Sequence, residues 1–263
     1  MTEARKFALV TGASSGIGLE LAKQFVLHDY DLLVSAEEVA IHRAADALSS
    51  SGASVTPLQV DLRTYDGVES LYSAVTAVGR PLDAAALNAG VGLGGAFVET
   101  DLGRELDMID LNVKSTVHLA KRVLSDMVTR NEGRMLITSS IASTMPGSFH
   151  SVYNATKSFL QSFAEAVQNE LKDTGVVITS LMPGPTDTNF FDRAEMDDTR
   201  VGQGSKDDPA QVAKQGFDAL MDGDLTVVAG SIKTKTMEAA GKVLPDALKA
   251  EQHRTMAEPG SGT

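Results

Sequence analysis

The chain has 263 residues, of which 43% are hydrophobic and 22% are charged, and this is the composition of an ordinary globular protein. The formal net charge of −12 repels a phosphate backbone, so we expect no nucleic-acid partner. The absence of cysteine excludes disulfides and thiolate chemistry and suits a reducing compartment, so we expect a cytoplasmic protein. No apolar run approaches ~20 residues and the N-terminus leads straight into a strand, so we expect neither a membrane span nor a signal peptide.

The first predicted element is a short apolar strand at 7–10, followed by Thr11-Gly-Ala-Ser-Ser-Gly-Ile-Gly18 and a helical pattern from Leu19 to Val26. This order is typical of a pyrophosphate site, because glycines let the backbone approach the ligand and a helix N-terminus offers unpaired N–H groups. The spacing G-x-x-x-G-x-G differs from the general G-x-G-x-x-G fingerprint. A plain Gly-rich turn is the alternative, and the flanking strand and helix favour the nucleotide site.

The second predicted strand, 31–36, is followed by Glu37 and Glu38. An acid at this place can accept hydrogen bonds from an adenosine ribose and would repel a 2′-phosphate. Alternatively, the two glutamates begin the next helix and only complement its dipole. The third strand, 54–60, ends at Asp61.

The fourth predicted strand, 83–87, runs into the small residues of 88–95, which form either a close passage for a ligand or only a flexible loop. A long helical pattern then covers 102–129, with Asn112 in its apolar middle. A buried amide must find hydrogen-bond partners. Asn112 therefore bonds either the backbone or a water molecule in a proton path.

The fifth strand, 135–138, ends just before Ser140, and a helix is predicted from Ser151 to Leu171. Positions i and i+4 share a helix face, so Lys157 lies beside Tyr153. A nearby cation lowers the pKa of a phenol, and Tyr153 can then exchange a proton near neutral pH. The alternative is a chance Y-x-x-x-K on a solvated face. The Ser140 hydroxyl could bond a substrate oxygen.

The sixth strand, 176–182, is stopped by Pro183-Gly-Pro185, and a polar segment at 186–208 is either a substrate lid or disordered. A helix from Pro209, a last strand at 225–229 and a helical pattern at 233–249 follow, and we expect a disordered tail over about 251–263. Alternating strands and helices predict one α/β domain over 1–263, with a parallel sheet covered on both faces. Ligands bind at the carboxyl ends of such strands, where Gly12, Asp61, Asn88, Ser140 and Pro183 all lie.

These motifs together resemble the short-chain dehydrogenase/reductase family in its single-domain form. The resemblance runs from about Phe7 to Ala229 and rests on T-G-A-S-S-G-I-G at 11–18, Asp61, N-A-G at 88–90, Asn112, Ser140, Y-N-A-T-K at 153–157 and P-G-P-T-D-T at 183–188. It implies a three-layer Rossmann fold with a doubly wound parallel sheet of about seven strands, and NAD(P) as cofactor.

The resemblance also implies roles for individual residues. Tyr153 would be the general acid-base, Lys157 would lower its pKa and hold the nicotinamide ribose, Ser140 would polarise the substrate oxygen, and Asn112 would anchor a water. The implied cofactor-binding residues are Gly12, Ser14, Ser15, Gly16, Ile17, Gly18, Glu37, Asp61, Leu62, Asn88, Ala89, Gly90, Tyr153, Lys157, Pro183, Gly184, Thr186 and Thr188. The five histidines show no metal-ligand spacing, so no metal is expected.

The choice of cofactor depends on the end of the second strand. Members that prefer NAD usually carry an acid where this chain has Ala36, and members that prefer NADP often carry Arg where this chain has Glu37. No cation that could read a 2′-phosphate is visible in the sequence. We predict NAD, with NADP as the alternative.

The leading function is therefore a reversible NAD(P)-dependent oxidoreductase that acts on a ketone, an aldehyde or a secondary alcohol. The alternative is a dinucleotide-binding sensor or scaffold without turnover, and a sugar-nucleotide epimerase or dehydratase would need a further substrate domain. Predicted pocket walls at Val91, Leu93, Ile141, Met145 and Phe149 indicate an apolar substrate. Family members commonly pair through the helices that carry Asn112 and Tyr153, so we expect a homodimer or homotetramer.

Overall fold

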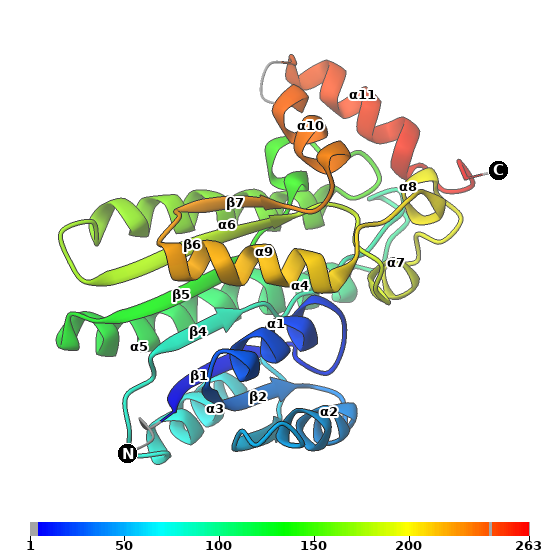
Figure 1. Cartoon of the computed structure of the whole chain (residues 1–263). Helices are drawn as coiled ribbons and strands as arrows, with labels where there is room; N and C mark the ends of the chain where they lie inside the picture. Colours follow the sequence, from blue (N-terminus) through cyan, green and yellow to red (C-terminus); the bar gives the residue numbers. More distant parts are fainter. Residues whose placement is uncertain (1–4, 242–243, 263) are drawn as a thin grey trace.

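The structure is a computed structural model that describes residues 5–241 and 244–262. These residues form a parallel sheet of seven strands in the order β3-β2-β1-β4-β5-β6-β7 (Figure 1). The strands are β1 (Lys6–Thr11), β2 (Tyr30–Ala36), β3 (Val55–Gln59), β4 (Ala84–Leu87), β5 (Gly133–Thr138), β6 (Val176–Pro183) and β7 (Thr226–Ala229). Every neighbouring pair is parallel, which confirms the predicted doubly wound sheet.

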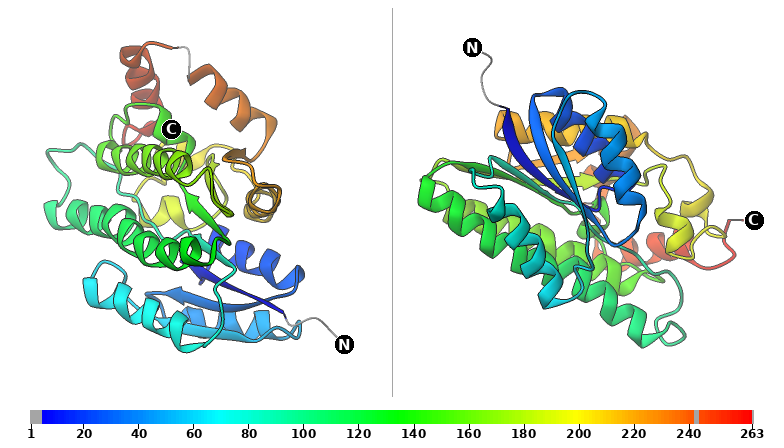
Figure 2. Two further views of the ribbon diagram at one scale, coloured as in Figure 1. Left: turned by 90° about the vertical axis from the view of Figure 1, so that its left-hand side faces the viewer. Right: turned by 90° about the horizontal axis from the view of Figure 1, so that it is seen from below.

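Helices cover both faces of the sheet, so the molecule has three layers (Figure 2). One apolar core lies between the sheet and α1 (Gly16–Leu27), α2 (Ala40–Ser49) and α9 (Pro209–Asp222). The other lies between the sheet and α3 (Tyr65–Ala77), α5 (Ser115–Arg130) and α6 (Ser151–Glu170). Successive side chains of a strand point to opposite faces, and β1 accordingly sends Ala8 into the first core and Leu9 into the second.

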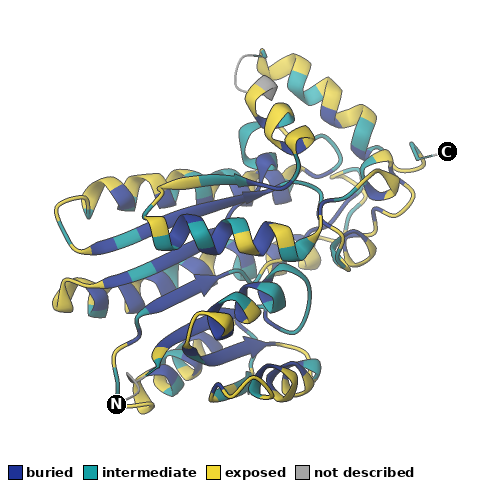
Figure 3. Cartoon of the chain, viewed as in Figure 1, coloured by how far each residue is buried: buried dark blue, intermediate teal, exposed yellow. Residues whose placement is uncertain are grey.

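The five inner strands are buried along most of their length, the edge strands β3 and β7 are only partly buried, and the helices expose their outer faces to solvent (Figure 3). Strands that are buried on both faces read as nearly continuous apolar runs, and this is why their bounds in the structure agree with the sequence prediction to within a few residues. In the described part of the chain, no helix combines the length and the hydrophobicity that a membrane span requires.

The strand order reverses between β1 and β4, because the chain first moves outward from β1 to β3 and then returns to the other side of β1. A crevice forms at such a reversal, beyond the carboxyl ends of the strands. The short helices α7 (Phe190–Arg193) and α8 (Arg200–Gln203) lie at this end of the sheet, together with α11 (Asp246–Ala257) (Figure 1). The polar segment 186–208 thus contains two short helices.

The predicted long helix at 102–129 is divided in the structure. It consists of α4 (Leu102–Ile109), a π-helical turn at Asp110–Lys114 and α5. The π-helical turn carries Asn112, whose side chain bonds the backbone of Val91 rather than a group of its own helix. A local π turn adds one residue to the helix and is common at functional sites.

The C-terminal part differs most from the sequence prediction. The helical pattern at 233–249 becomes two helices, α10 (Ile232–Gly241) and α11, and residues 242–243 lie outside the described residues. The prediction of a disordered tail is wrong for residues 251–262: α11 continues to Ala257, and the N–H groups of Gly260 and Gly262 donate to Asp198 at 2.7 and 2.9 Å. The Gly-rich composition of the tail predicted disorder. It could not indicate these contacts, because they are made to a segment far away in the sequence.

Candidate active site

A cavity of about 300 Å³ lies at the carboxyl ends of the strands. Its walls include every residue that the sequence predicted for the cofactor, and also Ser140, Tyr153 and Lys157. Of the predicted substrate walls, Val91, Ile141 and Met145 line the cavity. Leu93 and Phe149 were predicted wrongly, since Leu93 is buried in a cluster with Met108 and Phe149 packs against the cluster around Phe191.

The Gly-rich turn between β1 and α1 is tightly packed. Gly12 has a φ of +66°, which favours glycine, and a Cβ on Gly18 would lie 2.1 Å from the carbonyl oxygen of Gly12. The N-cap residue of α1, Ser15, makes no side-chain hydrogen bond to the first turn of the helix. The first N–H groups of α1 therefore face the cavity without a side-chain cap, and this arrangement fits a phosphate group.

Two arginines, Arg63 and Arg193, lie near the end of the cavity that contains the Gly-rich turn. The sequence analysis identified neither of them as part of the site. Arg63 forms ion pairs with Glu37 and with Asp61, the latter at 2.9 Å. Its hydrogen bonds hold the pKa of Asp61 below the usual range. The Arg193 guanidinium lies 2.7 Å from a carboxylate oxygen of Glu38, and the other oxygen of Glu38 accepts a hydrogen bond from Ser14 Oγ at 3.3 Å. Sequence reasoning missed the pairs Arg63–Glu37 and Arg193–Glu38 because the members of each lie on segments far apart in the chain.

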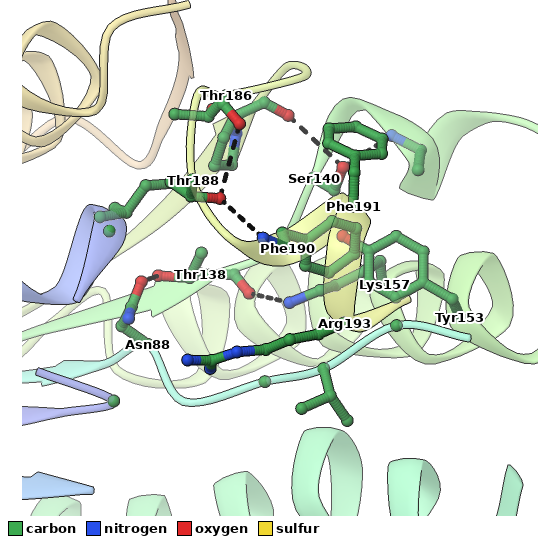
Figure 4. A pocket seen from close by; sticks show the side chains of 18 of the residues that line it. Asn88, Thr138, Ser140, Tyr153, Lys157, Thr186, Thr188, Phe190, Phe191 and Arg193 are labelled. Carbon is green, nitrogen blue, oxygen red and sulfur yellow. Dashed lines mark hydrogen bonds between the residues drawn. The ribbon is translucent and has the colours of Figure 1, made fainter. Parts of the chain in front are cut away.

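Tyr153 and Lys157 lie together on the cavity side of α6, as the i,i+4 spacing predicted (Figure 4). The Lys157 Nζ atom is 5.7 Å from the centre of the Tyr153 ring and donates to the carbonyl oxygen of Thr138 at 2.9 Å. Burial lowers the pKa of Lys157 to about 8. Asn112 fixes the neighbouring loop, and a Cβ on Gly90 would lie 3.5 Å from Lys157 Nζ, so small residues leave room for this ammonium.

The predicted lowering of the Tyr153 pKa is not found in this structure. Burial raises the pKa of Tyr153 to about 12, and a hydrogen bond with the Ser140 side chain opposes this rise. The prediction failed because it weighed the neighbouring cation but not the removal of the phenol from water, which disfavours its charged form. Both members of the pair are therefore held toward their neutral forms.

Ser140 has a fixed orientation. Its hydroxyl accepts the Ala142 N–H at 3.1 Å, which caps the short 3₁₀ turn Ile141–Thr144, and it lies 3.4 Å from the carbonyl oxygen of Pro183. Since Pro183 ends β6 and Ser140 follows β5, the hydroxyl sits between two strand ends. The hydroxyl also lies within hydrogen-bond distance of the Tyr153 side chain, so one substrate atom can contact both groups.

Asn112 does not line the cavity but holds one of its walls. Its amide accepts from the Val91 N–H and donates to the Val91 carbonyl, both at 2.9 Å, and it donates to Thr156 Oγ1 at 3.1 Å. The contacts with Val91 are the backbone bonds that one of the two alternatives for this buried amide predicted. They fix the loop of residues 88–92 against α6.

Sequence reasoning missed several residues of the cavity. The His150 ring stacks on the Tyr153 ring, and its Nε2 atom is buried without a hydrogen-bond partner within the described residues. Burial lowers the pKa of His150 to about 3, and His253 contributes to this. Its position one helical turn before Tyr153 was a usable signal. Phe190, which also lines the cavity, lies in the segment 186–208 that was predicted as a possible substrate lid. No signal in the sequence indicated three wall residues from the C-terminal segment, Met237, His253 and Met256.

The sequence model of the short chain dehydrogenases matches residues 6–199. The chain belongs to this family. Among its relatives, the uncharacterised oxidoreductase YmfI of Bacillus subtilis is 30% identical over 72% of this chain and 78% of its own length. The NADP-dependent 3-hydroxy acid dehydrogenase YdfG of Salmonella typhi is 30% identical over 74% of this chain and 79% of its own length.

Solved structures of short chain dehydrogenases share the fold. An enzyme from Burkholderia phymatum in complex with NAD has a TM-score of 0.83 and 22% identity, covering 98% of this chain and 99% of its own. An enzyme from Sphingobium yanoikuyae in complex with NADPH has a TM-score of 0.79 and 24% identity, covering 89% of this chain and 93% of its own. In this short chain dehydrogenase, Met237, His253 and Met256 lie beyond the residues that the family model matches. The C-terminal segment therefore adds its own walls to the cavity.

Proposed function

We propose that this short chain dehydrogenase is an NAD(P)-dependent oxidoreductase that transfers hydride between nicotinamide and a ketone, an aldehyde or a secondary alcohol, with Tyr153 as general acid-base. The observation that carries the proposal is that Ser140, Tyr153 and Lys157 line the same cavity as the Gly-rich turn of α1. A dinucleotide bound at that turn and a substrate oxygen at Tyr153 would share one cavity.

The residues present fit a dinucleotide. The uncapped N-terminus of α1 would hold its phosphates, Asp61 and Leu62 its adenine, residues 88–90 its adenosine side, Lys157 its nicotinamide ribose and Thr188 its carboxamide. When bound, the cofactor supplies the hydride chemistry, and the protein supplies orientation and the proton.

Tyr153 supplies that proton. With its pKa raised to about 12, the phenol is protonated at neutral pH and is in the form that donates a proton to a carbonyl oxygen during reduction. During oxidation the same atom has to accept a proton, and this step depends on a cation that stabilises the phenolate. Lys157 is placed to do so, because its ammonium lies on the same side of α6.

Ser140 and Asn112 support this exchange. The fixed hydroxyl of Ser140 would bond the substrate oxygen and hold the reacting carbon in place. Asn112 would anchor a water beside Lys157, and its contacts to Val91 keep the loop in position for this role. Both assignments follow the family resemblance and the placement of the residues.

We propose NAD as the preferred cofactor, with NADP as the alternative. Glu37 and Glu38 line the cavity and would repel a 2′-phosphate, whereas the relative YdfG is by its name NADP-dependent. Kinetics with NADH and with NADPH, measured on the same substrate, test the proposal. A preference for NADPH of more than about tenfold would reject it.

The substrate is proposed to carry a sizeable apolar group. Met145, Met237 and Met256 line the cavity, and the same three methionines also line a second cavity of about 340 Å³. Methionine side chains are flexible and adapt to varied apolar shapes. A panel of aliphatic and aromatic ketones and alcohols, followed by nicotinamide absorbance, would identify the class, and a strict preference for small polar carbonyls would contradict the proposal.

A Tyr153→Phe variant tests the catalytic role and separates it from the alternative of a sensor or scaffold. We expect the variant to bind NADH with an affinity close to that of the unmodified protein and to lose roughly 10²- to 10⁴-fold of its turnover. Unchanged turnover would remove Tyr153 from the mechanism. A protein that binds NADH but reduces no member of the carbonyl panel would favour the non-catalytic alternative.

A homodimer or homotetramer is also proposed. Leu102, Leu106 and Ile109 expose apolar side chains on α4, and Phe159 does so on α6, which are the elements next to Asn112 and Tyr153. Light scattering at micromolar concentration tests this, and a monomer would refute it. A cytoplasmic location stays a prediction.

A further inference from the structure

The ionic contacts of Arg193 point to a role that neither the sequence nor the family match assigns. Arg193 ends α7, in the segment that follows β6, Glu38 follows β2, and both line the cavity. Their ion pair at 2.7 Å therefore joins two walls of the cavity. In Figure 4 the Arg193 side chain extends across the cavity and away from Tyr153.

The charges around the cavity make this arginine unusual. Among the described residues that line the cavity, the acids are Glu37, Glu38 and Asp61, and the Lys or Arg side chains are Lys157 and Arg193. Lys157 is committed to the catalytic end, where it bonds Thr138. Of these two cations, Arg193 is the one at the end of the cavity that holds Glu38, and Arg63, which lies near this end outside the lining, is paired with Glu37 and Asp61.

The partners of Glu38 resemble those that a phosphate would take. One carboxylate oxygen pairs with Arg193, and the other accepts from Ser14 Oγ in the Gly-rich turn at 3.3 Å. A guanidinium and a hydroxyl next to a helix N-terminus are the donors that proteins use for phosphate. The carboxylate of Glu38 occupies these donors in this structure.

The backbone of Arg193 is well held. Phe191 is buried in a cluster with Ala194 and Met196, and the Arg193 N–H donates to the Asn189 carbonyl at 3.1 Å. The side chains of Arg193 and Glu38 are nevertheless 44% and 43% exposed, so their ion pair contributes little to stability and can exchange partners.

We propose that Arg193 binds a phosphate group of the dinucleotide, which it takes in exchange for Glu38. This inference rests on the proposed function, because it assumes that the cavity binds a dinucleotide. The phosphate is either the pyrophosphate, common to NAD and NADP, or the 2′-phosphate of NADP. In both cases Glu38 acts as a competitor for the guanidinium.

Calorimetric titration with nicotinamide-free fragments tests the exchange without any need for turnover. Each protein is titrated with ADP-ribose and with its 2′-phosphorylated form. We expect Arg193→Met to weaken binding about tenfold, ~1.4 kcal/mol, and Glu38→Gln to strengthen it about threefold. Equal weakening of both ligands by Arg193→Met assigns the pyrophosphate, and weakening of the 2′-phosphorylated ligand alone assigns the 2′-phosphate.

The matched control is Arg104→Met. Arg104 forms an ion pair of the same length, 2.7 Å, with Glu195 from the same segment, but it does not line the cavity. This variant is expected to leave both affinities unchanged. Arg193→Lys retains the charge without the planar fork and is expected to recover part of the loss.

Opposite changes in ligand affinity for Arg193→Met and Glu38→Gln distinguish an exchange of partners from an ion pair that only holds the two walls together. If the pair only held the two walls together, both Arg193→Met and Glu38→Gln would weaken binding, and that result would overturn the proposal. An unchanged affinity in Arg193→Met would overturn it as well. Failure of the unmodified protein to bind either fragment would instead reject the proposed function, and this inference with it.

Discussion

The imidazole ring of His150 lies against the phenol ring of Tyr153, with ring centres 4.2 Å apart and planes inclined by 14°. Both side chains are buried, and the stack covers one face of the phenol. Because burial is the main cause of the raised pKa of Tyr153, the imidazole takes part in keeping this phenol protonated. His150 itself is neutral at pH 7, since its own pKa is lowered to about 3.

We predict that His150→Ala lowers the pKa of Tyr153 from about 12 toward its ordinary value of 10. The smaller side chain admits water to the face of the ring, and water favours the phenolate. Ultraviolet titration of tyrosinate follows the change, with His150→Ala/Tyr153→Phe as the reference that isolates the Tyr153 signal. His150→Phe keeps an aromatic ring in place and is expected to leave the pKa high. A pKa that stays near 12 in the alanine variant would show that other neighbours cause the burial.

The second prediction concerns stability and Lys157. Its pKa in the folded chain, about 8, lies below the ordinary value of 10.5, so between these two pH values the unfolded chain binds more protons than the folded one. By linkage, this group lowers stability below about pH 8, and the loss disappears as pH rises toward 10.5. A shift of this size is worth ~3 kcal/mol. Removing the ammonium also loses its hydrogen bond to Thr138, worth ~1 kcal/mol.

Lys157→Met is therefore expected to raise the free energy of unfolding by about 2 kcal/mol at pH 7, while it abolishes turnover. The gain should shrink as pH rises from 8 toward 10.5, because the unmodified protein then loses its buried charge. Urea unfolding at a series of pH values measures both effects. A variant that is less stable at pH 7, or a gain that grows with pH, would contradict the assignment of a destabilising buried ammonium.

The sequence identified those parts of the site that lie close together along the chain. Tyr153 and Lys157 are one helical turn apart, and Gly12 to Gly18 form a single turn after a buried strand, so local spacing was enough to find them. Arg193 and Glu38 meet only because α7 folds back over the end of β2. His253 reaches the cavity because α11 packs there, with its Nδ1 atom 2.8 Å from the Ser148 carbonyl oxygen. Such contacts depend on tertiary packing and leave no periodic signal in the sequence.

The third prediction concerns the choice between NADH and NADPH. Glu37 would repel a 2′-phosphate and also engages Arg63, which bonds Asp61 as well. Glu37→Gln removes the repulsion and frees part of the Arg63 guanidinium from its ion pair with Glu37. We therefore expect NADPH to bind about tenfold more tightly relative to NADH than it does in the unmodified protein. Fluorescence titration with each reduced cofactor measures the ratio. Glu165→Gln, on the exposed face of α6 and away from the cavity, is the control. An unchanged ratio would show that Glu37 does not face the 2′ position.

The fourth prediction tests whether α11 forms part of the substrate site. Met256 lines the cavity together with Met145 and Met237, so a charge at this position would have to be buried against apolar groups whenever an apolar substrate binds. Met256→Lys should raise KM for apolar ketones about tenfold or more and change the dissociation constant of NADH less than twofold, because the Gly-rich turn lies elsewhere in the cavity. Thr255→Lys adds the same charge at the adjacent, exposed position of α11 and should change neither value.

If both variants raise KM equally, a general electrostatic effect is responsible, and if neither does, the substrate binds without contact to the C-terminal segment. A rise confined to Met256→Lys would place the apolar part of the substrate against α11, beyond the region that the family model covers.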